Sequence, residues 1–308
     1  MMFYLIIAAL ILLLILSGCV YTYVICFHVP RKHYENPYQR VNTPQFRSVQ
    51  HLMDQGTQIL ESTDCEDVTI TSYDGLKLHG RYYAVQDGAP VIIAFHGYRS
   101  AALRDCAIGF SLGLKYGYNV LAVDQRAHGK SEGHVITFGI KERYDCRSWV
   151  AYISERFGAD RPILLSGVSM GAATVLMAAD LTLPKNVKGI IADSAYSSPA
   201  NIIRKVCRDI GYPVKLTYPL VKLGARIFGS VNLNASSAVH SVENTNLPIL
   251  LIHGEKDLFV PCEMSQMIHE NAANSRLYTF PEAGHGLSYL TDPSRYEAIC
   301  LEFMKDIF

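Results

Sequence analysis

Residues 164–173 constrain the fold of this chain more than any other stretch. An apolar run leads into the pattern Gly-x-Ser-x-Gly at residues 167–171, and small residues that suit a helix follow. The pattern is typical of a strand that reverses sharply into a helix, because Gly167 and Gly171 let the two backbones pass closely while Ser169 projects alone. We therefore expect a strained turn that presents Ser169 as a nucleophile.

Composition narrows the class of protein. The 308 residues are 49% hydrophobic, enough for one large domain with a sizeable core. The 28 basic residues balance the 28 acidic ones, and no basic stripe interleaved with aromatics occurs, which argues against a nucleic-acid partner. The 8 cysteines show no zinc-finger or redox spacing. Unpaired thiols favour a reducing compartment, and Cys106, Cys146 and Cys262 are expected to pack in the interior.

The first 29 residues predict a transmembrane anchor. Residues 1–27 contain no Asp, Glu, Lys or Arg, and about 20 apolar residues suffice to cross a bilayer as a helix. The first basic residues, Arg31 and Lys32, follow this segment, which by the positive-inside rule puts the catalytic domain in the cytoplasm. The alternatives are a cleaved signal peptide, a lipoprotein anchored at Cys19 after the box Leu-Ser-Gly-Cys, and an extracytoplasmic domain.

Residues 30–66 predict a juxtamembrane linker and one helix. Apolar side chains recur near helical spacing over residues 46–60, and prolines precede them. This helix is expected to pack on the domain or to lie along the membrane surface.

Residues 67–308 predict an α/β domain with a mostly parallel eight-stranded sheet and helices on both faces. A hairpin over residues 68–83 turns at Asp74-Gly75. Buried strands and helical segments then alternate, as crossover connections between parallel strands require. The expected strands cover residues 90–95, 119–124, 162–168, 187–193, 248–253 and 276–280, and the expected helices residues 101–116, 141–157, 170–181, 263–272 and 293–308.

Residues 194–246 interrupt this alternation with helical, proline-broken sequence. Because the segment follows the carboxyl end of a strand, where ligands of open α/β sheets bind, we expect a small helical cap over the active site. Apolar residues of this cap insertion are candidates for shaping an acyl pocket: Tyr196, Tyr212, Tyr218, Leu220, Leu223 and Phe228.

Two further residues complete a candidate catalytic triad. A serine hydroxyl needs a base, histidine suits that task, and a carboxylate fixes the histidine tautomer. Asp257 and His285 each follow a predicted strand, in the chain order Ser, Asp, His. Asp193 also follows a strand and is the alternative acid.

Backbone amides complete the expected chemistry. The helix after Ser169 directs its N-terminal amides at a developing oxyanion. The amide of Met170, together with that of Tyr98 in the loop after the predicted strand at residues 90–95, would form the oxyanion hole.

From residue 68 to residue 308 the chain resembles the α/β-hydrolase superfamily. Several ordered motifs carry the resemblance: His96-Gly97, residues 124–131, residues 167–171, His253-Gly254 with Asp257, Val260-Pro261, and residues 284–286. With its apolar N-terminus the chain looks like the membrane-anchored, Bem46-like hydrolases of bacteria. The resemblance implies a serine hydrolase without cofactor or metal, acting on esters, thioesters or peptides.

Three functions remain open on sequence. The first is hydrolysis of small or lipid-like acyl esters near the bilayer. The second is an aminopeptidase or oligopeptidase, for which Glu243 and Asp209 in the cap insertion are candidate ligands of a substrate amine. The third is a catalytically silent, membrane-tethered scaffold, which would have no need of an intact triad. The sequence carries no signal for oligomeric state.

Overall fold

The computed structural model describes residues 1–30 and 44–308, and in one helix it leaves out the side chains of 106 and 108–111. Arg31, Lys32 and the side chain of Cys106 therefore lie outside the described part. Within it, eight strands form one sheet: β1 (Glu66–Thr71), β2 (Lys77–Tyr83), β3 (Val91–Phe95), β4 (Asn119–Val123), β5 (Ile163–Val168), β6 (Val187–Asp193), β7 (Ile249–Gly254) and β8 (Ser275–Phe280).

The strands follow the order β1-β2-β4-β3-β5-β6-β7-β8. β1 and β2 form the predicted hairpin, β2 pairs antiparallel with β4, and the remaining neighbours are parallel. Every residue of β3, β4 and β7 is buried, as expected of strands covered on both faces. The predicted mostly parallel eight-stranded sheet is thus confirmed.

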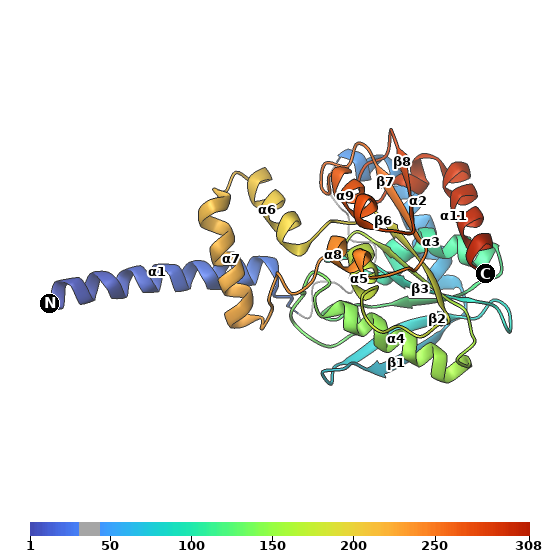
Figure 1. Cartoon of the computed structure of the whole chain (residues 1–308), viewed down its shortest axis with the longest axis horizontal. Coiled ribbons are helices and arrows are strands. Elements are labelled where there is room, and N and C mark those ends of the chain that lie inside the picture. Colours follow the sequence, from blue (N-terminus) through green and yellow to red (C-terminus); the bar gives the residue numbers. More distant parts are fainter. Residues whose placement is uncertain (31–43) are drawn as a thin grey trace.

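Helices cover both faces of the sheet (Figure 1). One face packs against α2 (Pro44–Ser62), α3 (Ala102–Lys115) and α11 (Pro293–Ile307). The other packs against α4 (Glu142–Phe157), α5 (Met170–Ala178), α8 (Ala238–Glu243) and α9 (Glu263–Asn271), and the one-turn α10 (Ser288–Thr291) precedes α11. Each face has its own apolar core, and Cys146 lies in one of them.

The apolar N-terminal segment forms one straight helix, α1 (Met2–Cys26). It protrudes from the domain, with the N-terminus at one end of the molecule and the C-terminus at the other (Figure 1). Among the described residues, α1 alone is long and apolar enough to cross a membrane. Its 25 residues correspond to roughly 37 Å of helix.

The end of α1 is built into the domain. Phe27 is fully buried, Val29 N–H donates to the His134 carbonyl, and Ile136 N–H donates to the Phe27 carbonyl. The cap insertion supplies α6 (Pro199–Asp209) and α7 (Val214–Phe228), which share a third apolar core with this part of the chain. In Figure 1, α7 lies across α1.

Candidate active site

The turn after β5 holds Ser169 in a strained backbone conformation. Its φ of 55° and ψ of −113° lie where L-residues rarely occur. A Cβ on Gly167 would overlap the backbone of Gly171, and a Cβ on Gly171 would overlap the carbonyl of Phe95. The two glycines therefore permit the close backbone contacts that the sequence predicts.

Three side chains from separate loops form a continuous hydrogen-bonded chain. Ser169 Oγ lies 2.9 Å from His285 Nε2, and His285 Nδ1 lies 2.7 Å from Asp257 Oδ2. They follow β5, β8 and β7 respectively, at the carboxyl edge of the sheet. The structure thus brings together the serine, acid and histidine named from the sequence, in the geometry of a nucleophile, a base and an orienting carboxylate.

The environment of Asp257 keeps its carboxylate ionised. Its side chain is fully buried, and its Oδ1 accepts hydrogen bonds from the amides of Phe259 and Val260 at 2.9 and 2.8 Å. Burial by itself would raise the pKa of Asp257, but the charge and hydrogen bonds of His285 and His253 hold that pKa well below its usual value. A permanent negative charge here stabilises a positive imidazolium on His285.

Asp193, the alternative acid, serves another part of the site. Its Oδ1 accepts a 2.9 Å hydrogen bond from Ser194 Oγ, and Ser194 Oγ in turn accepts one of 3.0 Å from the amide of Gly286. Complete burial raises the pKa of Asp193. Its contacts therefore support the loop that carries His285.

The two residues whose amides are predicted to form an oxyanion hole belong to segments that adjoin Ser169. Met170 is the first residue of α5, so its N–H has no acceptor within the helix. Tyr98 belongs to the loop after β3, and a Cβ on the preceding Gly97 would lie 3.5 Å from the Ser169 Cβ. The Gly97 amide donates to Asp105 Oδ2 at 2.8 Å, which fixes this loop.

The loop after β3 is also tied to the end of α1. Tyr98 Oη donates to the Cys26 carbonyl at 2.9 Å, and Arg99 Nη2 donates to the Ile25 carbonyl at 2.7 Å. The Tyr98 ring stacks on Phe138, with 5.1 Å between centroids. The candidate oxyanion loop is thus held directly by the N-terminal helix.

A cavity of about 610 Å³ opens over Ser169 and His285. Its apolar walls come from the loop after β7, with Leu258 and Phe259, and from α2. The residues that line it are Pro44, Gln45, Phe46, Met53, Gly97, Tyr98, Ser100, Arg104, Asp105, Val168, Ser169, Leu258, Phe259, His285 and Gly286.

The cavity walls do not come from the cap insertion, which the sequence predicts as the segment that shapes the pocket. Among the described residues that line the cavity, none lies between 194 and 246. Part of the apolar surface of the insertion instead packs on α1, where the Tyr23 and Phe228 rings lie 5.7 Å apart and Leu220 contacts Gly18. Because α1 is apolar and lies beside the insertion, these side chains pack on α1 and not over the cavity.

Helix α2 is the part of the site that sequence reasoning missed. Gln45 Nε2 donates to the Lys256 carbonyl at 3.0 Å, and the Gln45 side chain occupies the space that a Cβ on Gly284 would need. The helix therefore begins on the loops that carry the acid and the histidine. The spacing of Phe46, Met53 and Leu60 indicates an apolar face, but not which surface it covers.

Two other histidines near the site, His96 and His128, have structural roles. His96 Nε2 accepts from the Gln125 amide at 3.0 Å, and its Nδ1 donates to the Gly97 carbonyl. His128 Nε2 accepts from the Arg99 amide at 3.1 Å, and its Nδ1 donates to the Arg126 carbonyl. Both rings are therefore neutral. Burial lowers the pKa of His128 to about 3, and the neighbouring His96 contributes.

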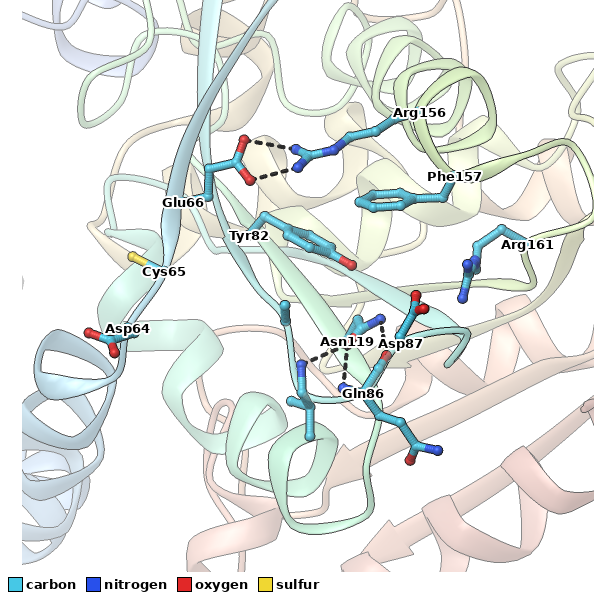
Figure 2. A pocket seen from close by; sticks show the side chains of 12 residues that line it. Asp64, Cys65, Glu66, Tyr82, Gln86, Asp87, Asn119, Arg156, Phe157 and Arg161 are labelled. Carbon is cyan, nitrogen blue, oxygen red and sulfur yellow. Dashed lines mark hydrogen bonds and ion pairs between the residues drawn. The ribbon is translucent and has the colours of Figure 1, made fainter.

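A second hollow, of about 510 Å³, lies away from Ser169 beside β1 and β2 (Figure 2). Arg156 forms two hydrogen bonds with Glu66, at 3.0 and 2.6 Å, and Asn119 holds the backbone of Val85 and Gln86. These polar groups are engaged with one another. In the described part of the chain, no group of three or more His, Cys, Asp or Glu side chains is placed to hold a metal ion.

Known proteins resemble this chain in sequence and fold. A family model described as serine aminopeptidase S33 matches residues 86–231. The protein YqkD of Bacillus subtilis is 24% identical over 259 residues, which cover 82% of this chain and 85% of YqkD.

Solved structures extend the likeness over most of the chain. The esterase Pf2001 of Pyrococcus furiosus is 26% identical, with a TM-score of 0.65, over 88% of this chain and 99% of the esterase. Est1E of Butyrivibrio proteoclasticus with bound ferulic acid is 22% identical, with a TM-score of 0.61, over 78% of this chain and 98% of Est1E. The sheet order, the serine turn and these likenesses together show that the chain has the α/β-hydrolase fold.

Proposed function

We propose that the protein is a serine hydrolase that cleaves carboxylic esters or thioesters through an acyl-enzyme. The observation that carries the proposal is the hydrogen-bonded chain from Ser169 through His285 to Asp257. The Ser169 end of this chain opens into a cavity. A silent scaffold has no need for a nucleophile, a base and an ionised carboxylate in register.

The chemistry follows from these contacts. His285 Nε2 takes the Ser169 hydroxyl proton as Oγ attacks the ester carbonyl carbon. The amides of Met170 and Tyr98 stabilise the negative oxygen of the tetrahedral intermediate. His285 then protonates the departing alcohol or thiol, and the acyl group stays on Ser169. Water, deprotonated by His285, then attacks the carbonyl carbon of the acyl-enzyme. The resulting tetrahedral intermediate collapses and releases the carboxylic acid, and His285 returns the proton to Ser169 Oγ.

The cavity walls favour an apolar acyl group. Phe46, Met53, Leu258 and Phe259 offer apolar surface next to Ser169. The Phe259 ring lies edge-on to His285, with 5.1 Å between centroids. The esterase Pf2001, which has a similar structure, supports an ester as substrate. We therefore propose a small or lipid-like acyl ester.

We further propose that α1 tethers this domain to a membrane as an uncleaved, single-pass anchor. Side chains 1–17 are exposed along the protruding part of α1, which suits a lipid environment. Arg31 and Lys32 favour a cytoplasmic domain. Cleavage before Cys19, as in a lipoprotein, would remove this exposed part and leave a short helix whose Cys19 is buried against α7.

A peptidase is the second candidate, because the matching family model is described as a serine aminopeptidase. The acids named for holding a substrate amine do not lie in the described cavity wall: Asp209 pairs with Lys205, and Glu243 lies 3.3 Å from His240. Asp105 does line the cavity, but it is engaged by the Gly97 amide and Arg104. These contacts favour the ester.

The test compares p-nitrophenyl esters from acetate to long acyl chains with aminoacyl nitroanilides, using wild type and Ser169→Ala. We expect ester turnover that falls by about 10⁶-fold in the variant. Faster turnover of the anilides would overturn the esterase in favour of the peptidase. No turnover of either class by a folded protein would favour a scaffold.

A further inference from the structure

Helix α7 exposes two parallel stripes of side chains. Leu216, Leu223 and Ile227 share one face, since they are seven and four residues apart, and they are 70%, 41% and 52% exposed. Each is preceded by an exposed basic residue, in the order Lys215, Lys222 and Arg226. An apolar stripe beside a basic stripe is typical of a helix that lies in the plane of a membrane surface.

The neighbouring helix and turn have the same character. From Pro199 to Phe228 the chain has six basic residues and one acidic residue, Asp209. The turn between α6 and α7 exposes Ile210 and Tyr212, at 59% and 44%. Apolar surface surrounded by positive charge complements a bilayer with anionic headgroups.

Contacts between α1 and α7 determine the depth in a bilayer at which α7 would lie. A Cβ on Gly224 would overlap the Cys19 carbonyl, and the hydroxyls of Tyr21 and Tyr212 lie 3.5 Å apart. A membrane span needs about 20 residues, so one that starts at Met2 ends near Tyr21. Helix α7 therefore crosses α1 where the apolar interior of the bilayer gives way to its headgroups.

We propose that α6 and α7 are a second membrane-binding element, which lies in the headgroup layer of an anionic bilayer. Leu216, Leu223 and Ile227 insert among the upper acyl chains, and the basic stripe contacts lipid phosphates. The inference rests on the proposed tethering by α1. A single helix leaves a domain free to rotate about the helix axis, whereas a second attachment fixes which side faces the bilayer.

The test places a fluorophore on α7 of the full chain in phosphatidylcholine vesicles, with and without phosphatidylglycerol. The variants are Leu216→Trp and Leu223→Trp, and the matched control is Phe308→Trp, also at an exposed apolar residue but at the opposite end of the molecule (Figure 1). The single native tryptophan, Trp149, is buried in the core. Lipids brominated on their acyl chains quench only tryptophans that enter the bilayer.

We expect brominated lipid to remove most of the fluorescence at positions 216 and 223 and none at 308. Replacing Lys215, Lys222 and Arg226 together by Gln should abolish the additional quenching that phosphatidylglycerol causes. Circular dichroism checks that each variant is folded, independently of ester hydrolysis.

Three results would overturn the inference in distinguishable ways. Protein that floats with the vesicles but shows equal quenching at 216 and 308 would leave the tether intact and refute the role of α7. Protein that does not float would refute the tether as well. Shielding of position 216 from lipid together with a dimer on cross-linking would show that a second copy of this chain covers the stripe.

Discussion

The carboxyl edge of the sheet and the proposed membrane side, which consists of helices α1 and α7, meet opposite structural requirements. At the edge, buried polar groups are joined by hydrogen bonds, as in the chain from Ser169 to Asp257. On the membrane side, α1 and α7 leave apolar side chains exposed. Hydrogen bonds need fixed directions between donor and acceptor, whereas apolar contact needs only apolar surface. In our proposal, chemistry is concentrated at the edge, while the membrane side determines where that chemistry takes place.

The largest effect expected from this comparison concerns the acid. Asp257→Asn should lower kcat for a p-nitrophenyl ester by about 10⁴-fold, because asparagine cannot hold the same histidine tautomer. Asp193→Asn should cost far less, since Asp193 acts through Ser194 and not on His285. His285→Ala should leave less activity than Asp257→Asn. Equal losses at the two aspartates would show that the wrong acid has been chosen.

A substitution at the contact between α1 and α7 tests whether a change on the membrane side affects catalysis at the edge. Gly224→Leu should lower the free energy of unfolding by about 1–3 kcal/mol, because the new side chain overlaps the backbone of α1. The kcat for a short soluble ester should not change. Thermal unfolding in detergent measures the first quantity, with the exposed Lys222→Leu as control. A large loss of kcat would mean that the two regions are coupled.

The burial of His128 at the edge predicts that the free energy of unfolding depends on pH. Burial lowers the pKa of His128 to about 3, so between pH 6.5 and pH 3 the unfolded chain binds a proton that the folded chain does not. This residue therefore stabilises the fold less as pH falls through that window, by up to about 1.4 kcal/mol per pH unit. Urea unfolding at pH 7 and pH 5 should show a smaller change for His128→Asn than for wild type. The exposed His240→Asn should behave as wild type.

The smallest effect concerns α2, which supplies part of the cavity wall at the edge. Phe46→Ala removes apolar surface from the cavity wall and should lower kcat/KM for long-chain esters by about tenfold. The acetate ester, which is too short to reach that wall, should be hydrolysed as by wild type. Leu52→Ala, on the same helix but not in the wall, is the control. An equal loss for all chain lengths would place Phe46 in the support of the triad rather than in the substrate site.

Local sequence patterns were sufficient wherever neighbours along the chain determine structure. The two glycines around Ser169, the alternation of buried strands and helices, and the apolar length of α1 each express a constraint within a few residues. The predicted strands and helices consequently differ from the observed ones by only a few residues at their ends, as for α5, which ends at Ala178 and not at residue 181.

Two features depended on tertiary structure. Asp193 is the last residue of β6 and Asp257 follows β7, and the pairing of β6, β7 and β8 decides which carboxylate lies 2.7 Å from His285. Likewise, the sequence contains two apolar segments able to cover the cavity, α2 and the cap insertion. The insertion packs on α1, which leaves the cavity wall to α2. A sequence states which surfaces are apolar, but the choice of partner for each surface is made by the packing of the whole chain.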